Sequence, residues 1–251
     1  MGNPFDLSGR AAIVTGANTG LGQALAVALA QAGADIVAVG RSAMDETQGL
    51  VAAAGRRCHA IKADLSTIAP VSGIVEETLA AFGRLDILVN NAGIIRRADA
   101  VDFTEEDWDA VIDTNLKSVF FLCQAAGRHM LAQGAGKIIN IASMLSFQGG
   151  IRVPSYTASK SGVAGLTRLL ANEWAGRGVN VNAIAPGYFA TNNTAALQAD
   201  ETRNRAILER IPAGRWGQPA DLGGAAVFLA SRASDYVHGH ILAVDGGWLA
   251  R

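Results

Sequence analysis

The stretch Thr15-Gly16-Ala17-Asn18-Thr19-Gly20-Leu21-Gly22 constrains the fold of this chain more than any other. It follows an apolar run at residues 11–14 and precedes an alanine- and leucine-rich segment at residues 23–31. A strand, a glycine turn and a helix in immediate succession begin an open α/β sheet. Glycines at such a turn let the backbone approach a pyrophosphate, which binds at the helix N-terminus because the first N–H groups there lack partners. The motif therefore predicts a nucleotide-binding turn.

Short apolar runs and helical patterns alternate along the rest of the chain. The expected strands are 11–15, 35–40, 58–62, 87–90, 137–141, 180–184 and 241–244, and expected helices include 20–32, 71–82, 105–132 and 155–175. Strands that are apolar throughout indicate a sheet covered on both faces, and 50% of the residues are hydrophobic, enough for a large core. The pattern predicts one α/β domain over residues 1–251, a Rossmann-type doubly wound parallel sheet of about seven strands with helices on both faces.

Residues 190–212 interrupt this alternation, because they are polar and helix-prone and contain no strand pattern. They follow the expected strand 180–184, and ligands of open α/β sheets bind beyond the carboxyl ends of the strands. We therefore expect this segment to form a lid over a substrate.

Charge and cysteine content exclude several classes of function. The net charge of −1 argues against nucleic acid or an anionic membrane as a partner. Two cysteines are too few for a disulfide framework, and Cys123 lies in an apolar helical stretch where a buried thiol is expected. No Cys/His pattern has the spacing of a metal site. Without a targeting segment or a long apolar run, a cytoplasmic location is expected.

Tyr156 and Lys160 are four residues apart in a helical pattern, so they lie on the same face of the helix. A phenol has a pKa of about 10, too high for a base at neutral pH, and a nearby ammonium is expected to lower it. Ser143 follows the apolar segment 137–142 and offers a hydroxyl to the oxygen with which Tyr156 exchanges a proton. The three side chains predict general acid–base chemistry at an alcohol or a carbonyl.

These motifs resemble those of the short-chain dehydrogenase/reductase family, and the resemblance covers essentially the whole chain. In chain order the matching elements are the glycine motif 15–22, Asp64-Leu65, Asn90-Asn91-Ala92-Gly93, Asn115, Ser143, Tyr156, Lys160 and Pro186-Gly187. The resemblance implies a nicotinamide coenzyme, assembly as a homotetramer, and Asn115, Ser143, Tyr156 and Lys160 as the catalytic residues. Asn115 would bridge a local break in its helix and lead the proton from Lys160 to solvent.

The same resemblance implies which residues bind the coenzyme. They are Gly16, Asn18, Thr19, Gly20, Leu21, Arg41, Asp64, Leu65, Asn91, Ala92, Gly93, Tyr156, Lys160, Pro186, Gly187 and Thr191. The choice between NAD and NADP stays open. NAD-dependent members usually end the second strand with an acid, whereas here Gly40 occupies that place and Arg41 follows. A guanidinium suits the 2′-phosphate of NADP, but the most similar members are mostly NAD-linked.

Similar stretches around residues 93–97, 143–156, 185–194 and 244–251 suggest members that oxidise 2-keto-3-deoxy sugar acids. A sugar acid carries a carboxylate, which is best bound by an arginine. Arg152 is the favoured carboxylate ligand because it lies four residues before Tyr156, with Gln148 and Asn193 as weaker hydroxyl contacts. The apolar pair Trp248 and Leu249 is expected to pack into a subunit interface. Arg251 would then reach the substrate pocket of a neighbouring chain.

Three other functions stay open at this point. A dehydrogenase acting at C4 of 2-keto-3-deoxy-fuconate or rhamnonate and a gluconate 5-dehydrogenase share the same features. A non-catalytic dinucleotide-binding module is a different class, disfavoured because Asn115, Ser143, Tyr156 and Lys160 occur together.

Overall fold

One seven-stranded parallel sheet forms the centre of the computed structural model, which describes residues 2–251 except the side chain of Asn193. The strands are β1 (Ala11–Thr15), β2 (Asp35–Gly40), β3 (Cys58–Lys62), β4 (Ile87–Asn90), β5 (Gly136–Ile141), β6 (Val179–Pro186) and β7 (Ile241–Val244). Each expected strand is present, and only β5 and β6 are longer than expected.

The strand order is β3-β2-β1-β4-β5-β6-β7. Strands β1 to β3 extend from the centre to one edge and β4 to β7 to the other, so the strand order reverses between β1 and β4. These two strands are adjacent, with Val14 beside Val89. Their carboxyl ends carry the glycine motif and the Asn-Asn-Ala-Gly turn, which therefore lie side by side. Ligands of open α/β sheets bind at such a reversal point.

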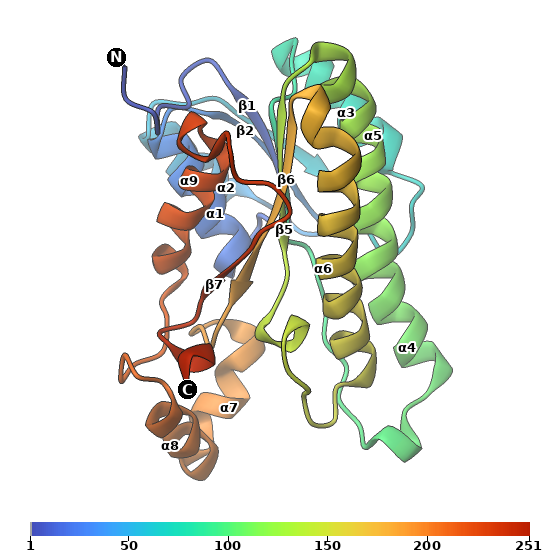
Figure 1. The fold of residues 1–251 in the computed structure, drawn as a ribbon, viewed down its shortest axis with the longest axis vertical. Coiled ribbons are helices and arrows are strands. Elements are labelled where there is room, and N and C mark those ends of the chain that lie inside the picture. The colour runs from blue at the N-terminus through green and yellow to red at the C-terminus, as the bar shows by residue number, and fades with distance from the viewer. Residues whose placement is uncertain (1) are drawn as a thin grey trace.

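Helices cover both faces of the sheet, as expected (Figure 1). The α-helices are α1 (Gly20–Gln31), α2 (Asp45–Ala53), α3 (Val71–Phe82), α4 (Glu105–Ile112), α5 (Ser118–Gln133), α6 (Pro154–Trp174), α7 (Ala195–Ala199), α8 (Glu201–Arg210) and α9 (Gly223–Ala230). Successive residues of one strand enter opposite cores. Ile13 packs in the core with residues of α3, α5 and α6, and Val14 in the core with residues of α1 and α9. No helix in the described part of the chain is long and apolar enough to cross a membrane.

The helix expected over residues 105–132 is interrupted in the middle. Between α4 and α5 the segment Asp113–Lys117 forms a π-helical turn, and Asn115 within it is fully buried. A π-helical turn disturbs the regular ladder of backbone hydrogen bonds, so the local break expected at Asn115 is confirmed.

The segment after β6 contains a 3₁₀ turn (Asn192–Thr194), α7 and α8. These helices lie beyond the carboxyl ends of the strands, next to the C-terminus (Figure 1). The two flanks of the segment are hydrogen-bonded to each other. The N–H of Ala190 donates to the carbonyl of Gly217, and the N–H of Gly217 donates to the carbonyl of Tyr188. A helical excursion anchored at its base has the form that a lid requires.

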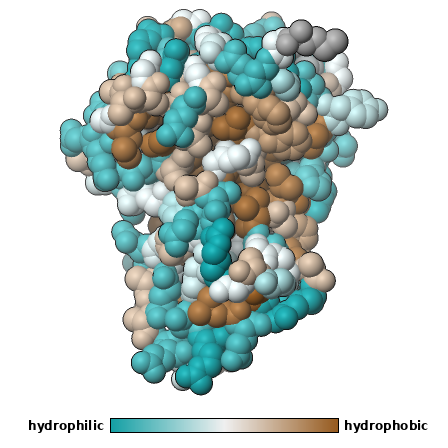
Figure 2. Space-filling model, turned by 90° about the vertical axis from the view of Figure 1, so that its left-hand side faces the viewer, coloured by the Kyte–Doolittle hydropathy of each residue, from teal (hydrophilic) through white to brown (hydrophobic). Residues whose placement is uncertain are grey.

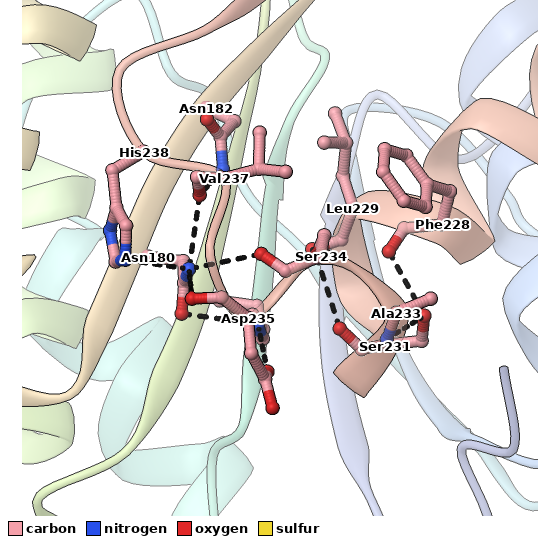
Figure 3. A network of polar contacts seen from close by, with 11 residues as sticks. Asn180, Asn182, Phe228, Leu229, Ser231, Ala233, Ser234, Asp235, Val237 and His238 are labelled. Carbon is pink, nitrogen blue, oxygen red and sulfur yellow. Dashed lines mark hydrogen bonds and ion pairs between the residues drawn. The ribbon is translucent and has the colours of Figure 1, made fainter. Parts of the chain in front are cut away.

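Asn180 holds the segment that leads into the edge strand β7 (Figure 3). Lys137 donates to the Oδ1 of Asn180 at 3.1 Å, so the amide Nδ2 faces the opposite direction. This nitrogen lies 3.0 Å from the carbonyl oxygens of Asp235 and Val237 and 3.2 Å from that of Ser234. A buried side chain thereby satisfies a turn that would otherwise leave carbonyls without partners. It fixes where β7 and the C-terminal turn begin.

The expectation that Trp248 packs into a subunit interface is wrong for the side chain itself. Trp248 is 4% exposed within the single chain, and it packs with Met144, Ile207, Ile211 and Trp216. Residues Ile207 and Ile211, together with Met144 after β5, supply apolar surface that the sequence pattern assigned to a second subunit. Local hydrophobicity shows that a side chain will be covered, but not by which part of the assembly.

One outer face of the molecule is unusually apolar. Figure 2 shows hydrophobic residues gathered on the side that carries α9, whose sequence contains only glycine and apolar residues. Phe228 in α9 and Leu242 in the neighbouring edge strand β7 are only partly buried. A large exposed apolar patch on a folded protein commonly marks a site of interaction.

Candidate functional site

A cavity of about 670 Å³ opens at the carboxyl ends of the central strands. Most of the expected coenzyme-binding residues line it, namely Gly16, Asn18, Thr19, Gly20, Leu21, Arg41, Asp64, Leu65, Asn91, Ala92, Gly93, Tyr156, Lys160 and Thr191. Pro186 and Gly187 are not among the described lining residues. The cavity thus joins the glycine turn after β1 to the Tyr156–Lys160 pair on α6.

Two glycines of the turn after β1 leave no room for a side chain. Gly16 has a φ of +65°, and a Cβ there would lie 2.9 Å from the Nδ2 of Asn91. A Cβ on Gly22 would lie 2.1 Å from the carbonyl oxygen of Gly16, so the first turn of α1 can approach the loop only without a side chain. The start of α1 has no side-chain cap, and its first residues, Gly20 to Gly22, line the cavity. This cradle fits the pyrophosphate of a dinucleotide.

Thr15 links the two turns at the reversal point, a role that the sequence pattern did not reveal. Its Oγ1 accepts the backbone N–H groups of Asn91 and Ala92, each at 3.0 Å. The Nδ2 of Asn91 in turn donates to the carbonyl of Thr15 at 2.9 Å. The three bonds fix the distance between the glycine turn and the Asn-Asn-Ala-Gly turn. A threonine that ends a buried strand is the only sequence signal for this contact.

Glycine stands at the end of β2, where many NAD-dependent proteins have an acid. A Cβ on Gly40 would lie 3.1 Å from the Oδ1 of Asn18, whose amide donates to the Oγ of Ser42 at 2.9 Å. The next residue, Arg41, is exposed and lines the cavity. Hydrogen bonds from Ser66 lower the pKa of the Asp64 carboxyl, and the charge of Arg41 adds to that effect. This corner therefore carries one cation beside one anion.

The acid–base group lies where β5 and α6 meet. Ser143 lies two residues after the end of β5 and is hydrogen-bonded to the phenol of Tyr156. The Nζ of Lys160 lies 5.6 Å from the centre of the Tyr156 ring and donates to the carbonyl of Ile141 at 2.5 Å. Lys160 and Tyr156 both line the cavity, so the i, i+4 spacing places both on one face of α6, as expected.

The expectation that the pKa of Tyr156 is lowered is wrong, because in this structure that pKa is raised. Burial raises the pKa of the phenol above its ordinary value of 10.0, while the Ser143 hydrogen bond and the charge of Arg97 lower it by less. Burial also lowers the pKa of Lys160 from 10.5 to about 8. Both groups lose water around their charged forms, and for Tyr156 this loss outweighs the effects of Ser143 and Arg97. Spacing along a helix cannot reveal that loss, because α6 alone does not bury either side chain.

Asn115 binds the backbone beyond the Asn-Asn-Ala-Gly turn. Its Oδ1 accepts the N–H of Ile94 and its Nδ2 donates to the carbonyl of Ile94, both at 2.8 Å. A Cβ on Gly93 would lie 3.2 Å from the same Oδ1. The π-helical turn is thereby tied to the cavity wall. The proton path through Asn115 stays a prediction.

The residues expected to bind a substrate are scattered. Arg152 has a φ of +63° and pairs with Asp99 at 3.1 Å, and it is absent from the described cavity wall. Gln148 contacts Arg210 and Trp248. Arg251 donates to the carbonyl of Glu209 in its own chain. The side chain of Asn193 lies outside the described part of the structure.

Arg97 is the arginine that the structure brings to the site. It lines the cavity, and its charge acts on the Tyr156 phenol. Its position after the Asn-Asn-Ala-Gly turn was the available sequence signal, but Arg96 beside it has the same signal and instead pairs with Asp107 at 3.0 Å. Among the described residues, no cluster of three or more His, Cys, Asp or Glu side chains could hold a metal ion.

Comparisons with known proteins agree with this arrangement. A family model described as Enoyl-(Acyl carrier protein) reductase matches residues 16–249. The 2-dehydro-3-deoxy-D-gluconate 5-dehydrogenase of Escherichia coli (strain K12) is 63% identical over 248 residues, 98% of each chain. The enzyme of the same name from Bacillus subtilis (strain 168) is 60% identical over 248 residues, 98% of this chain and 97% of that protein. A structure from Agrobacterium tumefaciens, solved with bound NADP, is 63% identical with a TM-score of 0.94, and 100% of each chain is covered.

Proposed function

This chain belongs to the short-chain dehydrogenase/reductase family, and we propose that it oxidises the C5 hydroxyl of 2-dehydro-3-deoxy-D-gluconate with a nicotinamide coenzyme. The observation that carries the proposal is that Tyr156, Lys160 and Arg97 line the same cavity as the glycine cradle. An acid–base group, a cation for a carboxylate and a dinucleotide site are what oxidation of a sugar acid requires. High identity to two enzymes of this name supports the substrate.

The nicotinamide coenzyme supplies the acceptor for the hydride that leaves the substrate carbon. Tyr156 takes the proton of the hydroxyl, and Ser143, hydrogen-bonded to the phenol, orients the same oxygen. Lys160 lies beside the Tyr156 ring, where its ammonium would favour the phenolate formed when Tyr156 loses its proton. Asn115 keeps the cavity wall in place through Ile94. In the reductive direction the same groups act in reverse order.

The proposal is tested by assaying the purified protein with a panel of sugar acids and following the absorbance of the reduced coenzyme. We expect turnover of 2-dehydro-3-deoxy-D-gluconate with a higher kcat/KM than gluconate or a six-carbon 2-keto-3-deoxy acid lacking the C6 hydroxyl. A preference for gluconate would replace the substrate assignment. Coenzyme binding without turnover of any sugar acid would indicate a binding module and reject the proposal.

For the coenzyme we propose NADP, bound at its 2′-phosphate by Arg41. The absence of an acid at Gly40 and the position of Arg41 on the cavity wall support this choice. Replacing Arg41 with alanine is expected to raise the KM for NADP by about tenfold or more and to change that for NAD by less than about threefold. Arg41→Lys is the control, since it keeps the charge and should lose less. Equal losses for both coenzymes would instead indicate that the guanidinium stacks on the adenine.

We propose Arg97, rather than Arg152, as the ligand of the substrate carboxylate. Arg97→Ala should raise the KM for the sugar acid by about tenfold or more, since a charge-assisted hydrogen bond is lost. Arg152→Ala is the matched control, because its guanidinium pairs with Asp99 outside the described cavity wall. Steady-state kinetics with saturating coenzyme measures both. A larger effect of Arg152→Ala would restore the assignment made from the sequence.

Residues 190–212 are proposed to act as the lid over the substrate, because they contribute Ala190, Thr191 and Thr194 to the cavity wall. The homotetramer implied by the family is proposed to use the apolar face formed by α9 and the edge strand β7 (Figure 2). A second copy that covers this face would also cover an unpaired strand edge, which folded proteins rarely leave open.

A further inference from the structure

Three distant parts of the chain meet at the side-chain oxygen of Gln148. The Nε1 of Trp248 donates to this Oε1 at 3.3 Å, and the Nη2 of Arg210 donates to it at 3.3 Å. Gln148 lies on the loop that follows Ser143, Arg210 is the last residue of the lid helix α8, and Trp248 belongs to the C-terminal turn. We name these three side chains the lid junction.

The junction is more than two hydrogen bonds. The guanidinium of Arg210 lies over the Trp248 ring at 4.0 Å from its centre, a cation–π contact. Tyr188, near the base of the lid, packs against the same ring with 4.7 Å between ring centres. Arg251 also donates to the carbonyl of Glu209 at the end of α8. The C-terminal turn therefore holds the end of the lid helix from two sides.

The junction is also connected to the catalytic group. Met144, the residue after Ser143, is 5% exposed and shares an apolar cluster with Trp248 and with Ile207 and Ile211 of the lid segment. A displacement of α8 away from the site must break contacts to the loop that positions Ser143. Packed cores tolerate such displacements poorly, so the lid and the loop are expected to move as one unit.

We propose that the lid junction positions α8 over the substrate and thereby sets the affinity for the sugar acid, without a part in proton or hydride transfer. This inference rests on the proposed function. Gln148 is then a positioning residue, because its oxygen is used by Arg210 and Trp248 and not by a substrate hydroxyl. Arg210 and Trp248 have the same status, since each acts on the substrate through the position of the lid.

Substitutions at Gln148 separate this role from direct substrate contact. Gln148→Leu removes the acceptor and should raise the KM for the sugar acid by about tenfold, with kcat changed less than about twofold. Gln148→Glu keeps an acceptor for both donors and should restore a KM near that of the wild type. If Gln148 contacted the substrate instead, the new carboxylate would repel the anionic acid and Gln148→Glu would have the higher KM. That order would overturn the proposal.

A double-mutant cycle tests whether the three side chains act as a unit. Arg210→Met and Trp248→Phe should each raise the KM by about five- to twentyfold. The KM of the double variant should be close to the higher of the two single-variant values, because both substitutions remove the same junction. Arg205→Met changes an exposed arginine on the same helix and is the matched control. If the two increases in KM multiply in the double variant, the side chains act independently and the junction is contradicted. If only Arg210→Met raises the KM, Arg210 acts directly on the substrate, which also contradicts the junction.

A measurement without substrate keeps this inference separate from the proposed function. Amide hydrogen exchange in α8 of the free protein should become faster in Arg210→Met and Trp248→Phe and remain unchanged in Arg205→Met. If no sugar acid is turned over by the wild type, the proposed function fails while this exchange still reports the junction. Unchanged exchange in all three variants would overturn the junction itself.

Discussion

Replacing Tyr156 with phenylalanine is expected to lower kcat by about 10²–10⁴-fold, the usual contribution of general acid–base catalysis. The phenol lines the cavity and is hydrogen-bonded to Ser143, so the substitution removes the hydroxyl to which the acid–base role is assigned. The ring itself is retained, and the cradle formed by the glycine turn is not touched. We therefore expect the dissociation constant of the coenzyme, measured by fluorescence or calorimetry, to change by less than about threefold.

The control for this variant is Tyr236→Phe, which removes a hydroxyl from a tyrosine that is 99% exposed and far from the cavity wall. It should leave kcat unchanged. A Tyr156→Phe variant that kept more than about a tenth of the wild-type rate would refute Tyr156 as the acid–base group. A loss of coenzyme binding in parallel with kcat would instead show that the phenol has a structural role.

Lys160→Met is expected to have the second-largest effect, because it removes the only ammonium within the acid–base group. We expect kcat to fall by about 10²-fold or more and the coenzyme to bind about tenfold more weakly, since charge-assisted hydrogen bonds are lost. Methionine keeps the length and the apolar stem of lysine, so the cavity wall is preserved. Stopped-flow kinetics and a coenzyme titration measure the two effects.

The same variant should change how stability depends on pH. Burial lowers the pKa of Lys160 to about 8 in the folded protein, against 10.5 in the unfolded chain. Below the lower value both states bind the proton, and the folded state carries the full penalty of a buried charge. Between the two values only the unfolded state keeps the proton, so wild-type stability rises with pH through this window. From about pH 8 to about pH 10 the gain is about 2 kcal/mol.

Lys160→Met has no such proton, so its free energy of unfolding should lack this rise. The comparison is made between the two proteins at each pH, because Tyr156 and Tyr188 have raised pKa values in the folded state and weaken both proteins alike above about pH 10. Chemical denaturation across the window measures the difference. Parallel curves for both proteins would show that the ammonium is not buried as the structure has it.

The expected secondary structure was confirmed because local patterns determine it. Apolar runs of strand length, the glycine turn and the helical spacing of Tyr156 and Lys160 are short-range features, and each was found at its place. The break at Asn115 was expected from the family resemblance, because an asparagine within a helical pattern does not by itself predict a break. The parallel direction of the strands followed from the alternation of strands and helices, because parallel neighbours need helical crossovers.

Other properties depended on contacts between distant parts of the chain. Arg96, Arg97 and Arg152 look alike in sequence, and only the fold shows that the charge of Arg97 acts on the Tyr156 phenol. The packing of Trp248 against Ile207 and Ile211 could not be inferred for the same reason.

The sequence by itself therefore determined the fold class, the glycine turn after β1 and the placing of Tyr156 and Lys160 on one face of a helix, because each depends on residues close together along the chain. Only the tertiary structure decided the electrostatics. Tyr156 has a raised pKa and Lys160 a lowered one because elements far apart in sequence exclude water from both. The contacts of Gln148 with Arg210 and Trp248 likewise join three segments that lie far apart in the sequence. No local sequence pattern predicts such contacts.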